Sequence, residues 1–418
     1  MYVLGDMYNS FRFVDTCRLC GSKDLEAVLS LNPSPLGDQY LPIGSGAKLT
    51  NLVPFAIKRC EKCKNFQTET AISRDHYRYC LTRPASVNAT LGNAYESSVE
   101  GLIELSEFSA NDFMLEIGTN DGLFASFFAK RGLRCLGVDP AANLIRSAND
   151  LGVTTICDFF GSAIAAEIAS SHGNAKLIVA NFVLANVDDL DDFVDGIKQV
   201  LSPDGVFVIE TNDVSSIAKK FLVETLVHEH LSYFSIMSLK KFFEKHELRV
   251  FDAVHVESKG GSLRLYVSHD QARYETRGRV ETAVLEEAGC LFSIDLWEKF
   301  GRVFALARES ANEFCERNFR SGIAGYGTSD GATTLLYQLG IGEFIKVLID
   351  DDPYRQNLES PGLGIPTVGK ERVFTSPPKV ESCLVLAPQY ARKIFDNNLT
   401  ARNLGVSFFE IWPLTKLI

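Results

Sequence analysis

The sequence has few basic residues for its length. Its 42 Lys and Arg stand against 53 Asp and Glu, which gives a formal net charge of −11 at pH 7. A general nucleic-acid or anionic-membrane binder needs a basic face, so this balance argues against both kinds of partner. No apolar run approaches the roughly 18 consecutive residues of a membrane span. The first 17 residues lack a basic stretch followed by an apolar one, so we expect no secretory signal and a cytoplasmic protein.

Tandem repeats, low-complexity runs and the G-x-G-x-x-G fingerprint of dinucleotide-binding proteins are also missing. At roughly 150 residues per domain, 418 residues predict two or three domains. We expect a first domain at 1–90, an α/β domain at 91–270, and a third part at 271–418 that opens with a charged helical stretch and then resumes the α/β pattern. The strands expected in the second domain are 113–118, 133–139, 175–181 and 205–211.

Four of the ten cysteines form two C-x-x-C pairs, Cys17 with Cys20 and Cys60 with Cys63. Two sulfurs three positions apart on a turn can face one tetrahedral ion, and four thiolates favour Zn²⁺ or an iron–sulfur centre. A redox C-x-x-C is the rival interpretation, although two pairs flanking a short β-like segment favour a structural role. With sulfur at all four positions the ion has no open site for catalysis, so we expect a structural Zn²⁺.

A glycine loop follows the first expected strand of the central domain. The run LEIGTNDG (115–122) places Glu116, Gly118 and Gly122 in an E-x-G-x-x-x-G pattern, whose glycines let the backbone approach a cofactor closely. The next strand ends in Asp139, about 20 residues on, where a carboxylate can bind a ribose diol. A Rossmann dehydrogenase is the competing interpretation, but it needs G-x-G-x-x-G. The pattern instead suits S-adenosylmethionine.

Polar residues follow the later strands as well. Asp158 and Phe159 stand where the third strand should end; there an acidic side chain can meet an adenine amino group and an aromatic ring can stack on the base. An ordinary strand–helix boundary is the alternative. Asn181 and Asn186 follow the fourth strand and are expected to face the methyl group, with a helix cap as the alternative for Asn181. The residues expected at the cofactor are Glu116, Gly118, Asn120, Gly122, Asp139, Asp158, Phe159 and Asn181.

Four further segments occur in one order: IETNDV (209–214), FLVETLVHEHLSYFS (221–235), KGGSLRLYV (259–267) and GYGTSDGATTLL (325–336). Together with the C-x-x-C pairs and EIGTNDG, they resemble the zinc-containing sugar C-methyltransferases over essentially the whole chain. The resemblance implies an α/β fold with a zinc-binding N-terminal lobe, a central Rossmann-like class I methyltransferase domain and a C-terminal Rossmann-like lobe. It also implies S-adenosylmethionine as methyl donor and a nucleotide-linked 4-keto-deoxysugar as substrate. We expect a monomer or a weak homodimer.

The resemblance also assigns roles to individual residues. His230 is the candidate general base, Glu229 its neighbour in the acid–base network, and His228 a further member of the catalytic set. For the HEH motif as a whole, a buried structural network or a metal pair is the alternative. A histidine with a pKa near neutrality suits removal of a proton next to a ketone. Asn186 joins this catalytic set. The residues expected at the substrate are Tyr77 and Tyr79 of a Y-x-Y segment, Lys259 and Arg264.

Some positions depart from the family pattern. Val227 stands where a tyrosine is usual and Asn186 where a histidine is usual. Lys259 replaces the histidine that usually begins the segment HGGSLR. In the C-terminal lobe, Asp330 stands where a lysine is common. Valine cannot donate to an enolate oxygen and asparagine cannot shuttle a proton, although Asn186 and Lys259 can still donate a hydrogen bond to an oxyanion. The resemblance makes carbon methylation the first hypothesis. The departures keep two others open: N- or O-methylation of a related small molecule, and a scaffold with a degenerate site.

Overall fold

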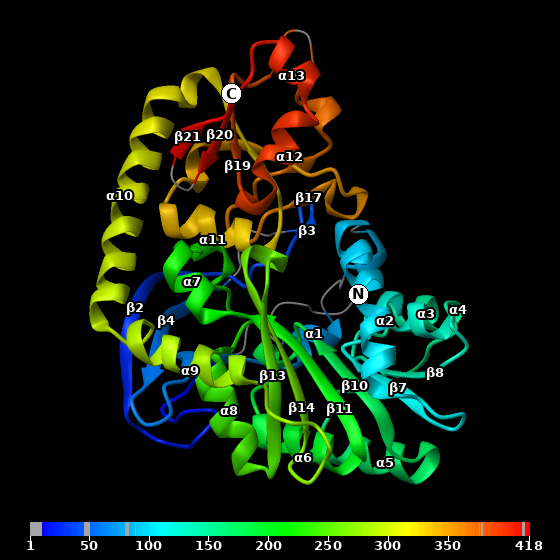
Figure 1. The fold of residues 1–418 in the computed structure, drawn as a ribbon. Coiled ribbons are helices and arrows are strands. Elements are labelled where there is room, and N and C mark those ends of the chain that lie inside the picture. The colour runs from blue at the N-terminus through cyan, green and yellow to red at the C-terminus, as the bar shows by residue number, and fades with distance from the viewer. Residues whose placement is uncertain are drawn as a thin grey trace.

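The computed structural model describes residues 11–45, 51–79, 83–87, 89–375, 377, 379–411 and 414–418. Three sheets of four, seven and six strands organise these residues, and two further pairs of short strands join distant segments. Figure 1 shows the seven-stranded sheet in the lower part of the molecule and the six-stranded sheet in the upper part. The expected α/β fold with Rossmann-like sheets is confirmed. The domain boundaries near residues 90 and 270 stay a prediction.

The four-stranded sheet belongs to the N-terminal lobe but takes its edge strand from the middle of the chain. Its order is β12-β5-β4-β2. The bounds are Leu25–Ser34 (β2), Val53–Cys60 (β4), Phe66–Thr68 (β5) and Ser232–Tyr233 (β12). Beside it, β1 (Phe11–Phe13) pairs antiparallel with β6 (Thr70–Ile72). The segment that follows the HEH motif is therefore built into the N-terminal lobe.

The seven-stranded sheet has the order β13-β14-β11-β10-β7-β8-β9. All its pairs from β9 to β11 are parallel, whereas β14 runs antiparallel to both neighbours. The bounds are Phe113–Ile117 (β7), Arg134–Val138 (β8), Thr154–Ile156 (β9), Ala175–Asn181 (β10), Leu201–Asn212 (β11), Leu248–Val256 (β13) and Ser262–His269 (β14). The four strands expected from the sequence are thus confirmed as β7, β8, β10 and β11. The strand order reverses between β7 and β10, which is where ligands bind in sheets of this kind.

Helices cover both faces of this sheet, which explains why its parallel strands are near-continuous apolar runs. The helices are Asp75–Tyr79 (α1), Ala89–Ser106 (α2), Leu123–Ala129 (α3), Ile145–Asp150 (α4), Ser162–His172 (α5), Leu190–Val200 (α6), Val214–Lys220 (α7) and Ile236–Lys245 (α8). One apolar cluster lies between β7, β10 and helices α5, α6 and α8, and another packs α2 and α3 on the other side. The sheet is therefore the middle layer of three.

The six-stranded sheet of the C-terminal lobe has the order β18-β16-β15-β19-β20-β21 and is parallel except for β21. Its strands are Ile323–Tyr326 (β15), Ile345–Ile349 (β16), Thr367–Val368 (β18), Ser382–Val385 (β19), Ser407–Ile411 (β20) and Leu414–Lys416 (β21). Its helices are Asp330–Leu339 (α11), Ala391–Asp396 (α12) and Leu399–Asn403 (α13). A short pair, β3 (Leu41–Pro42) with β17 (Leu358–Glu359), joins this lobe to the N-terminal one.

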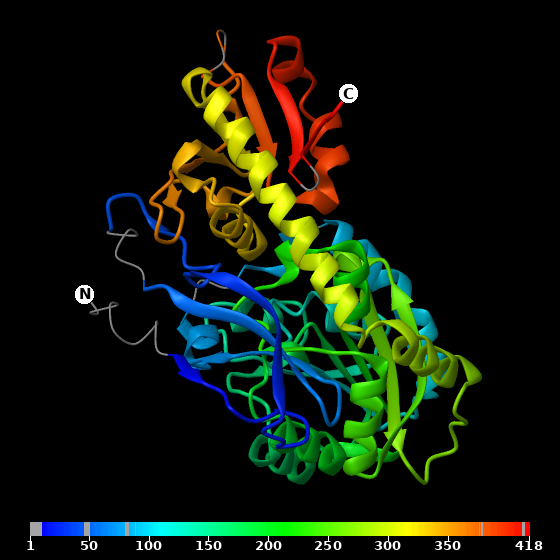
Figure 2. The ribbon, with the colours of Figure 1, turned by 90° about the vertical axis from the view of Figure 1, so that its left-hand side faces the viewer.

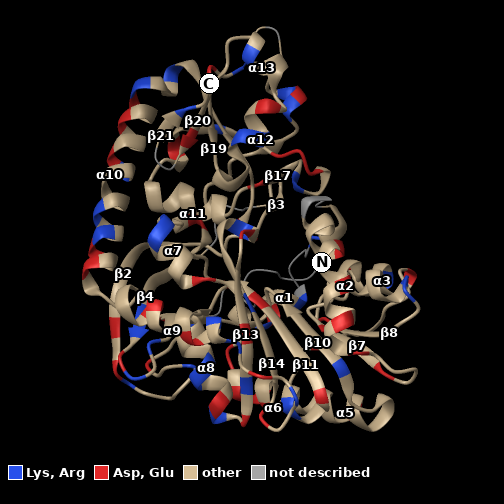
Figure 3. Ribbon diagram, in the orientation of Figure 1, with Lys and Arg blue, Asp and Glu red and all other residues tan. Residues whose placement is uncertain are grey.

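Two helices connect the lobes, α9 (Gly278–Cys290) and α10 (Ile294–Asn318). Helix α10 contacts β2 of the N-terminal lobe, α7 of the central part and α11 of the C-terminal lobe, and Figure 2 shows it running along one side of the molecule. Its buried side chains recur at helical spacing: Trp297, Phe300, Phe304, Ala307, Ala311 and Cys315. Acidic and basic residues are interspersed along it in Figure 3. Among the described residues, no helix is long and apolar enough to cross a membrane.

Candidate active site and metal centre

The four cysteines of the two C-x-x-C pairs come together in the N-terminal lobe. Their sulfur atoms all lie within 4.8 Å of one another. The Sγ atoms of Cys17 and Cys63 are 3.4 Å apart, and those of Cys20 and Cys60 are 3.6 Å apart. Zn–S bonds of about 2.3 Å at tetrahedral angles place sulfurs about 3.8 Å apart. The cluster therefore fits one tetrahedral ion with four thiolate ligands.

Each pair sits on the same kind of turn. The amide of Gly21 donates to the carbonyl of Cys17 at 2.8 Å, and the amide of Lys64 donates to the carbonyl of Cys60 at 2.9 Å. Both donors have left-handed backbone, with φ of 69° and 65°. A glycine adopts that conformation without strain, whereas Lys64 is held in it. The two turns face each other across the lobe and present all four sulfurs to one point.

A cavity of about 950 Å³ lies at the carboxyl ends of β7, β8, β9 and β10. It stands beside the point where the strand order reverses, as expected for a cofactor site in a sheet of this type. Its lining includes these residues predicted from the sequence: Tyr77, Gly118, Asn120, Asp139, Asp158, Phe159, Asn181, Asn186 and Lys259. The side-chain oxygen of Asn186 is buried there without a hydrogen-bond partner among the described residues. Such an orphaned acceptor fits a ligand that donates to it.

Asp139 is anchored at the end of β8 by two backbone amides. Its Oδ2 accepts from the amide of Asn120 and its Oδ1 from the amide of Ala141, both at 2.8 Å. Burial raises the pKa of Asp139, although these two donors oppose the shift. Each oxygen keeps a second lone pair, so the carboxylate can still accept from a ribose diol.

The two remaining residues of the glycine loop prediction lie behind the cavity. The Oε2 atom of Glu116 accepts from the amide of Ala125 at 3.1 Å and so ties β7 to the first turn of α3. Burial raises its pKa well above the ordinary value. Gly122 has φ of 81°, and a Cβ there would come within 2.8 Å of Cα of Ala148. Neither residue lines the cavity, so their contact with a cofactor stays a prediction.

Substitution of Asp139 by asparagine is expected to weaken cofactor binding by about 10- to 100-fold, since hydrogen bonds to a charged group contribute about 1.5–3 kcal/mol. Calorimetric titration with S-adenosylhomocysteine measures the change. Asp112→Asn is the matched control, because Asp112 also accepts from a backbone amide, that of Ser109, but lies outside the cavity. Equal dissociation constants for Asp139→Asn and the wild type would remove Asp139 from the cofactor site.

Two arginines, one directly before α1 and one within it, cover the positions predicted to bind adenine. The guanidinium of Arg78 donates to Oδ1 of Asp158 at 2.7 Å. The guanidinium carbons of Arg74 and Arg78 both lie 5.0 Å from the ring centroid of Phe159. The sequence reasoning did not include these arginines, although both belong to the same short segment as the Y-x-Y pair. Asp158 and Phe159 line the cavity, and their contact with adenine stays a prediction.

The HEH motif forms a turn that is pinned on three sides. The hydroxyl of Tyr77 donates to the carbonyl of Glu229 at 2.6 Å. The hydroxyl of Tyr233 accepts from the amide of Val227 at 3.0 Å and donates to its carbonyl at 3.1 Å. The amide of Leu231 donates to the carbonyl of Ala185 at 2.7 Å. These hydrogen bonds hold the turn rigid. Its three side chains, those of His228, Glu229 and His230, have different surroundings.

His228 points into the N-terminal lobe. Its Nε2 lies 3.1 Å from the hydroxyl of Ser34, and its ring lies 4.2 Å from that of Phe55. Burial lowers its pKa to about 4. The residue lines neither of the cavities described for this protein. This geometry is that of the structural network that the sequence left open as the alternative.

Glu229 is a buried acid beside other acids. Its Oε1 accepts from the amide of Gly37 at 3.0 Å, and its Oε2 is buried without a hydrogen-bond partner among the described residues. Burial, followed by the charges of Asp330 and Asp38, raises its pKa to about 8. At neutral pH the side chain therefore carries a proton and can donate it.

His230 keeps part of its surface exposed, unlike its two neighbours. Its Nδ1 lies 3.1 Å from the side-chain nitrogen Nδ2 of Asn212 and 3.3 Å from the backbone carbonyl oxygen of Thr225. Burial lowers the pKa of His230; the charge of Asp330 opposes that shift, and the charge of Lys259 adds to it. The imidazole is therefore neutral at pH 7. The cavity linings do not include His230 itself but do include Leu231 and Lys259.

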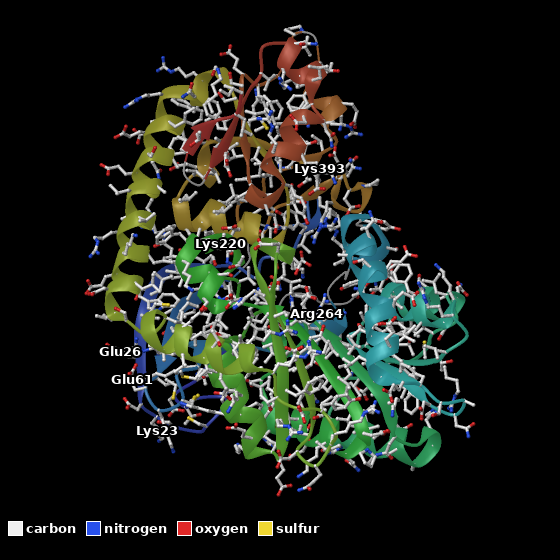
Figure 4. All side chains as sticks on the ribbon, in the orientation of Figure 1. Lys23, Glu26, Glu61, Lys220, Arg264 and Lys393 are labelled. Carbon is white, nitrogen blue, oxygen red and sulfur yellow. The ribbon has the colours of Figure 1, made fainter. Side chains whose placement is uncertain are left out.

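A second cavity of about 810 Å³ adjoins the first at Leu91, Tyr95 and Lys259. Lys259 has left-handed backbone, with φ of 49°, and its Nζ lies 3.5 Å from the ring centroid of Phe182. The second cavity lies between the central sheet and the C-terminal lobe, whose Tyr390 and Glu410 line it. Figure 4 labels Lys220 and Arg264, two cations of this lining.

Arg264 is already paired within the protein. Its Nε and Nη2 donate to Oε2 of Glu210 at 3.0 and 2.7 Å. Tyr77 lines the first cavity and also holds the HEH turn, whereas the side chain of Tyr79 lies outside the described part of the chain. Asn212 and Asp330 act on the HEH turn although neither was predicted as a site residue; Asp330 was noted only as a departure from the family pattern. The signal for Asn212 was its place in IETNDV, where one strand end meets the next helix.

The fold and the site define a methyltransferase that uses S-adenosylmethionine and carries a structural zinc centre. Three family models match the chain in order: a zinc binding domain over residues 17–77, a methyltransferase domain over 93–253 and a C-methyltransferase C-terminal domain over 257–413. The chain is 31% identical to the C-methyltransferase NovU of Streptomyces niveus over 420 residues, 99% of each protein. It belongs to this family of zinc-binding C-methyltransferases.

Solved structures resemble the chain over less than half its length. A SAM-dependent methyltransferase from Anabaena variabilis aligns with a TM-score of 0.33 at 14% identity, over 42% of this chain and 85% of its own. The PH0226 protein from Pyrococcus horikoshii aligns with a TM-score of 0.36 at 12% identity, over 47% of this chain and 99% of its own. The family assignment does not rest on these two likenesses.

Proposed function

We propose that the enzyme transfers a methyl group to a carbon next to the ketone of a nucleotide-linked sugar, by general-base enolisation, in branched deoxysugar biosynthesis. The observation that carries the proposal is the place of His230. It is a neutral, partly exposed imidazole whose neighbours Leu231 and Lys259 line the cofactor cavity. The naming of NovU as a C-methyltransferase supports carbon as the methylated atom. The second cavity, which shares Lys259 with the first, is the space for the sugar.

S-adenosylmethionine, when bound, supplies an electrophilic methyl group on a sulfonium, which the enolate carbon takes. His230 prepares that carbon. In one tautomer of His230, Nδ1 accepts from Nδ2 of Asn212; in the other, Nδ1 donates to the carbonyl of Thr225. In the second tautomer Nε2 keeps a lone pair and accepts the proton of the C–H bond next to the ketone. The electrons of that C–H bond form the C=C bond of the enolate, and the π electrons of the carbonyl move to its oxygen. Lys259 and Asn186 can then donate hydrogen bonds to the oxyanion.

Glu229 completes the acid–base set as a neutral acid. Its raised pKa of about 8 keeps a proton on the carboxyl group at pH 7, so one oxygen can donate while Oε1 accepts from the amide of Gly37. Asp330, from the start of α11, adds a negative charge that favours the protonated forms of both His230 and Glu229. The proton taken by His230 is thereby stabilised after enolisation. His230 and Glu229 belong to the central part of the chain, and Asp330 belongs to the C-terminal lobe. The site is therefore complete only when the two parts are packed together.

A labelled methyl group tests the proposal. The protein is incubated with S-adenosylmethionine carrying a ¹³C methyl group and a pool of nucleotide-linked 4-keto-deoxysugars, and products are read by mass spectrometry and NMR. We expect the label on a ring carbon. A label on nitrogen or oxygen would replace enolisation by direct attack of a heteroatom, which Val227 and Asn186 would permit. Binding of S-adenosylhomocysteine without any transfer would exclude 4-keto-sugars as the substrate class.

A further inference from the structure

Arg18 stands between the two cysteines of the first metal-binding turn, and its guanidinium is buried, with 2% of the side chain exposed. It makes four hydrogen bonds. Nη1 donates to the carbonyls of Leu231 at 2.9 Å and Thr68 at 3.1 Å, and Nη2 donates to the carbonyl of Thr70 at 3.1 Å. Nε donates to Oδ1 of Asp188 at 2.9 Å. A planar guanidinium fixes all these partners relative to one another.

Two of the four partners belong to the active site. Leu231 directly follows His230 and lines the cofactor cavity, and Asp188 lines the same cavity two residues after Asn186. The other two partners, Thr68 and Thr70, lie on strands β5 and β6 of the N-terminal lobe. One buried side chain thus connects the metal-binding turn with the segments that carry both His230 and Asn186.

The backbone around Leu231 depends heavily on this connection. Its carbonyl accepts from Arg18 and from the amide and hydroxyl of Thr68 at 3.0 and 3.3 Å. The next residues pair with β5, with Ser232 opposite Gln67. The side-chain oxygen of Gln67 in turn accepts from the amide of Arg18 at 2.9 Å. Removal of the guanidinium would leave buried carbonyls with fewer donors, and the turn would shift to find others.

We propose that Arg18 is a positioning residue, through which the metal-binding turn sets the place of His230 relative to the cofactor cavity. Arg18 touches neither cofactor nor substrate in this arrangement; it acts on the turn that bears the base. Displacement of a catalytic group by about 1 Å costs on the order of 10²-fold in rate. The role of the thiolate centre is then to hold Arg18 in register as well as to hold its own lobe.

Arg18→Gln and Arg18→Lys test the proposal in the full-length, metal-loaded protein. We expect each variant to keep the metal content of the wild type and to bind S-adenosylhomocysteine with little change, because Arg18 is not in the cavity lining. Hydrogen exchange at the amides of 228–233 should become faster in Arg18→Gln. The kcat of that variant should fall by about 10- to 100-fold, with Arg18→Lys in between because lysine keeps the charge without the fork.

Arg59→Gln is the matched control. Arg59 precedes Cys60, is also buried, and donates from Nη1 to a carbonyl at 2.7 Å, but that carbonyl belongs to Phe292. Its other partners, Glu26 and Glu61, are labelled in Figure 4 at the edge of the metal lobe. This variant should lose stability without faster exchange at 228–233.

Two results would overturn the proposal: unchanged exchange at 228–233 in Arg18→Gln, or loss of metal from that variant. The second would make Arg18 part of the metal site's own support. The catalytic role assumed for His230 rests on the proposed function, but metal content and hydrogen exchange do not. A failure of the wild type to methylate sugars would therefore leave the structural test intact.

Discussion

Replacement of His230 by alanine is expected to lower kcat for methyl transfer by about 10²- to 10⁴-fold, the range that general-base catalysis contributes. The neutral imidazole is the group in the site with a pKa suited to taking a proton from carbon at pH 7. His230→Gln should lose as much, since glutamine can accept a hydrogen bond but cannot hold a proton. Single-turnover rates with labelled S-adenosylmethionine measure the chemical step directly.

The dependence of the wild-type rate on pH is a second test of His230 as the general base. Because burial lowers the pKa of His230 below 6.5, the base stays unprotonated to lower pH than a free histidine. The rate should therefore hold as pH falls to 6.5 and decline only below it. Glu229, with its pKa of about 8, should give a second decline above that pH as it loses its proton. The decline at low pH is expected to disappear from the residual rate of His230→Gln.

The control for this experiment is His172→Gln. His172 is exposed at the end of α5 and lines neither cavity. It should change neither the rate nor the pH profile. A loss of less than about tenfold in His230→Ala would contradict general-base catalysis and would favour methylation of an atom that is already nucleophilic.

Loss of the metal centre is expected to be the most damaging change to stability. In Cys60→Ser one of the four thiolates is missing, and structural zinc contributes apparent binding free energies on the order of 10 kcal/mol in small zinc domains. The thermal midpoint should fall by about 10 °C or more, since each kcal/mol shifts it by about 2–4 °C in domains of moderate size. Calorimetry, together with metal content per chain, checks this.

Cys290→Ser is the matched control for that variant. Its sulfur lies 3.2 Å from the carbonyl of Glu286 on α9, a contact that a serine hydroxyl can keep. The Cys290→Ser variant should keep the metal content and the thermal midpoint of the wild type. Activity should fall in Cys60→Ser although no catalytic group is removed, because Arg18 is then no longer held. Full metal content and an unchanged midpoint in Cys60→Ser would show that the cluster does not bind its ion through four sulfurs.

Features encoded by neighbouring residues were predictable from the sequence. The two C-x-x-C turns place each pair of sulfurs locally, and the fold of the lobe brings the two pairs together. The polar residues at strand ends were also predictable. The carboxyl ends of parallel strands lie at the same edge of the sheet, and ligands bind there at the point where the strand order reverses. Asp139 and Asp158 follow β8 and β9, and Asn181 is the last residue of β10, yet all three line one cavity.

Contacts between distant segments were not predictable in this way. The sequence suggested that Asp158 meets adenine, but the pairing of Asp158 with Arg78 depends on where α1 packs. Asn212 and His230 are 18 residues apart, and a turn with no periodic pattern brings them together. The resemblance in KGGSLRLYV predicted Arg264 at the substrate, and its pairing with Glu210 on the neighbouring strand is a contact that the motif alone does not show.

The long-range pairs also determine the order in which a growing chain can fold. The metal-binding residues lie within the first 63 positions, so the nascent lobe can bind its ion early. Its sheet cannot gain β12 until the carbonyl of Leu231, 163 residues beyond Thr68, has been synthesised. The contact of Asn32 forms later still, because its backbone amide donates to the side-chain oxygen of Gln338, 306 residues away. Contacts of such high order form slowly, so the early metal site holds the first lobe together until its partners emerge.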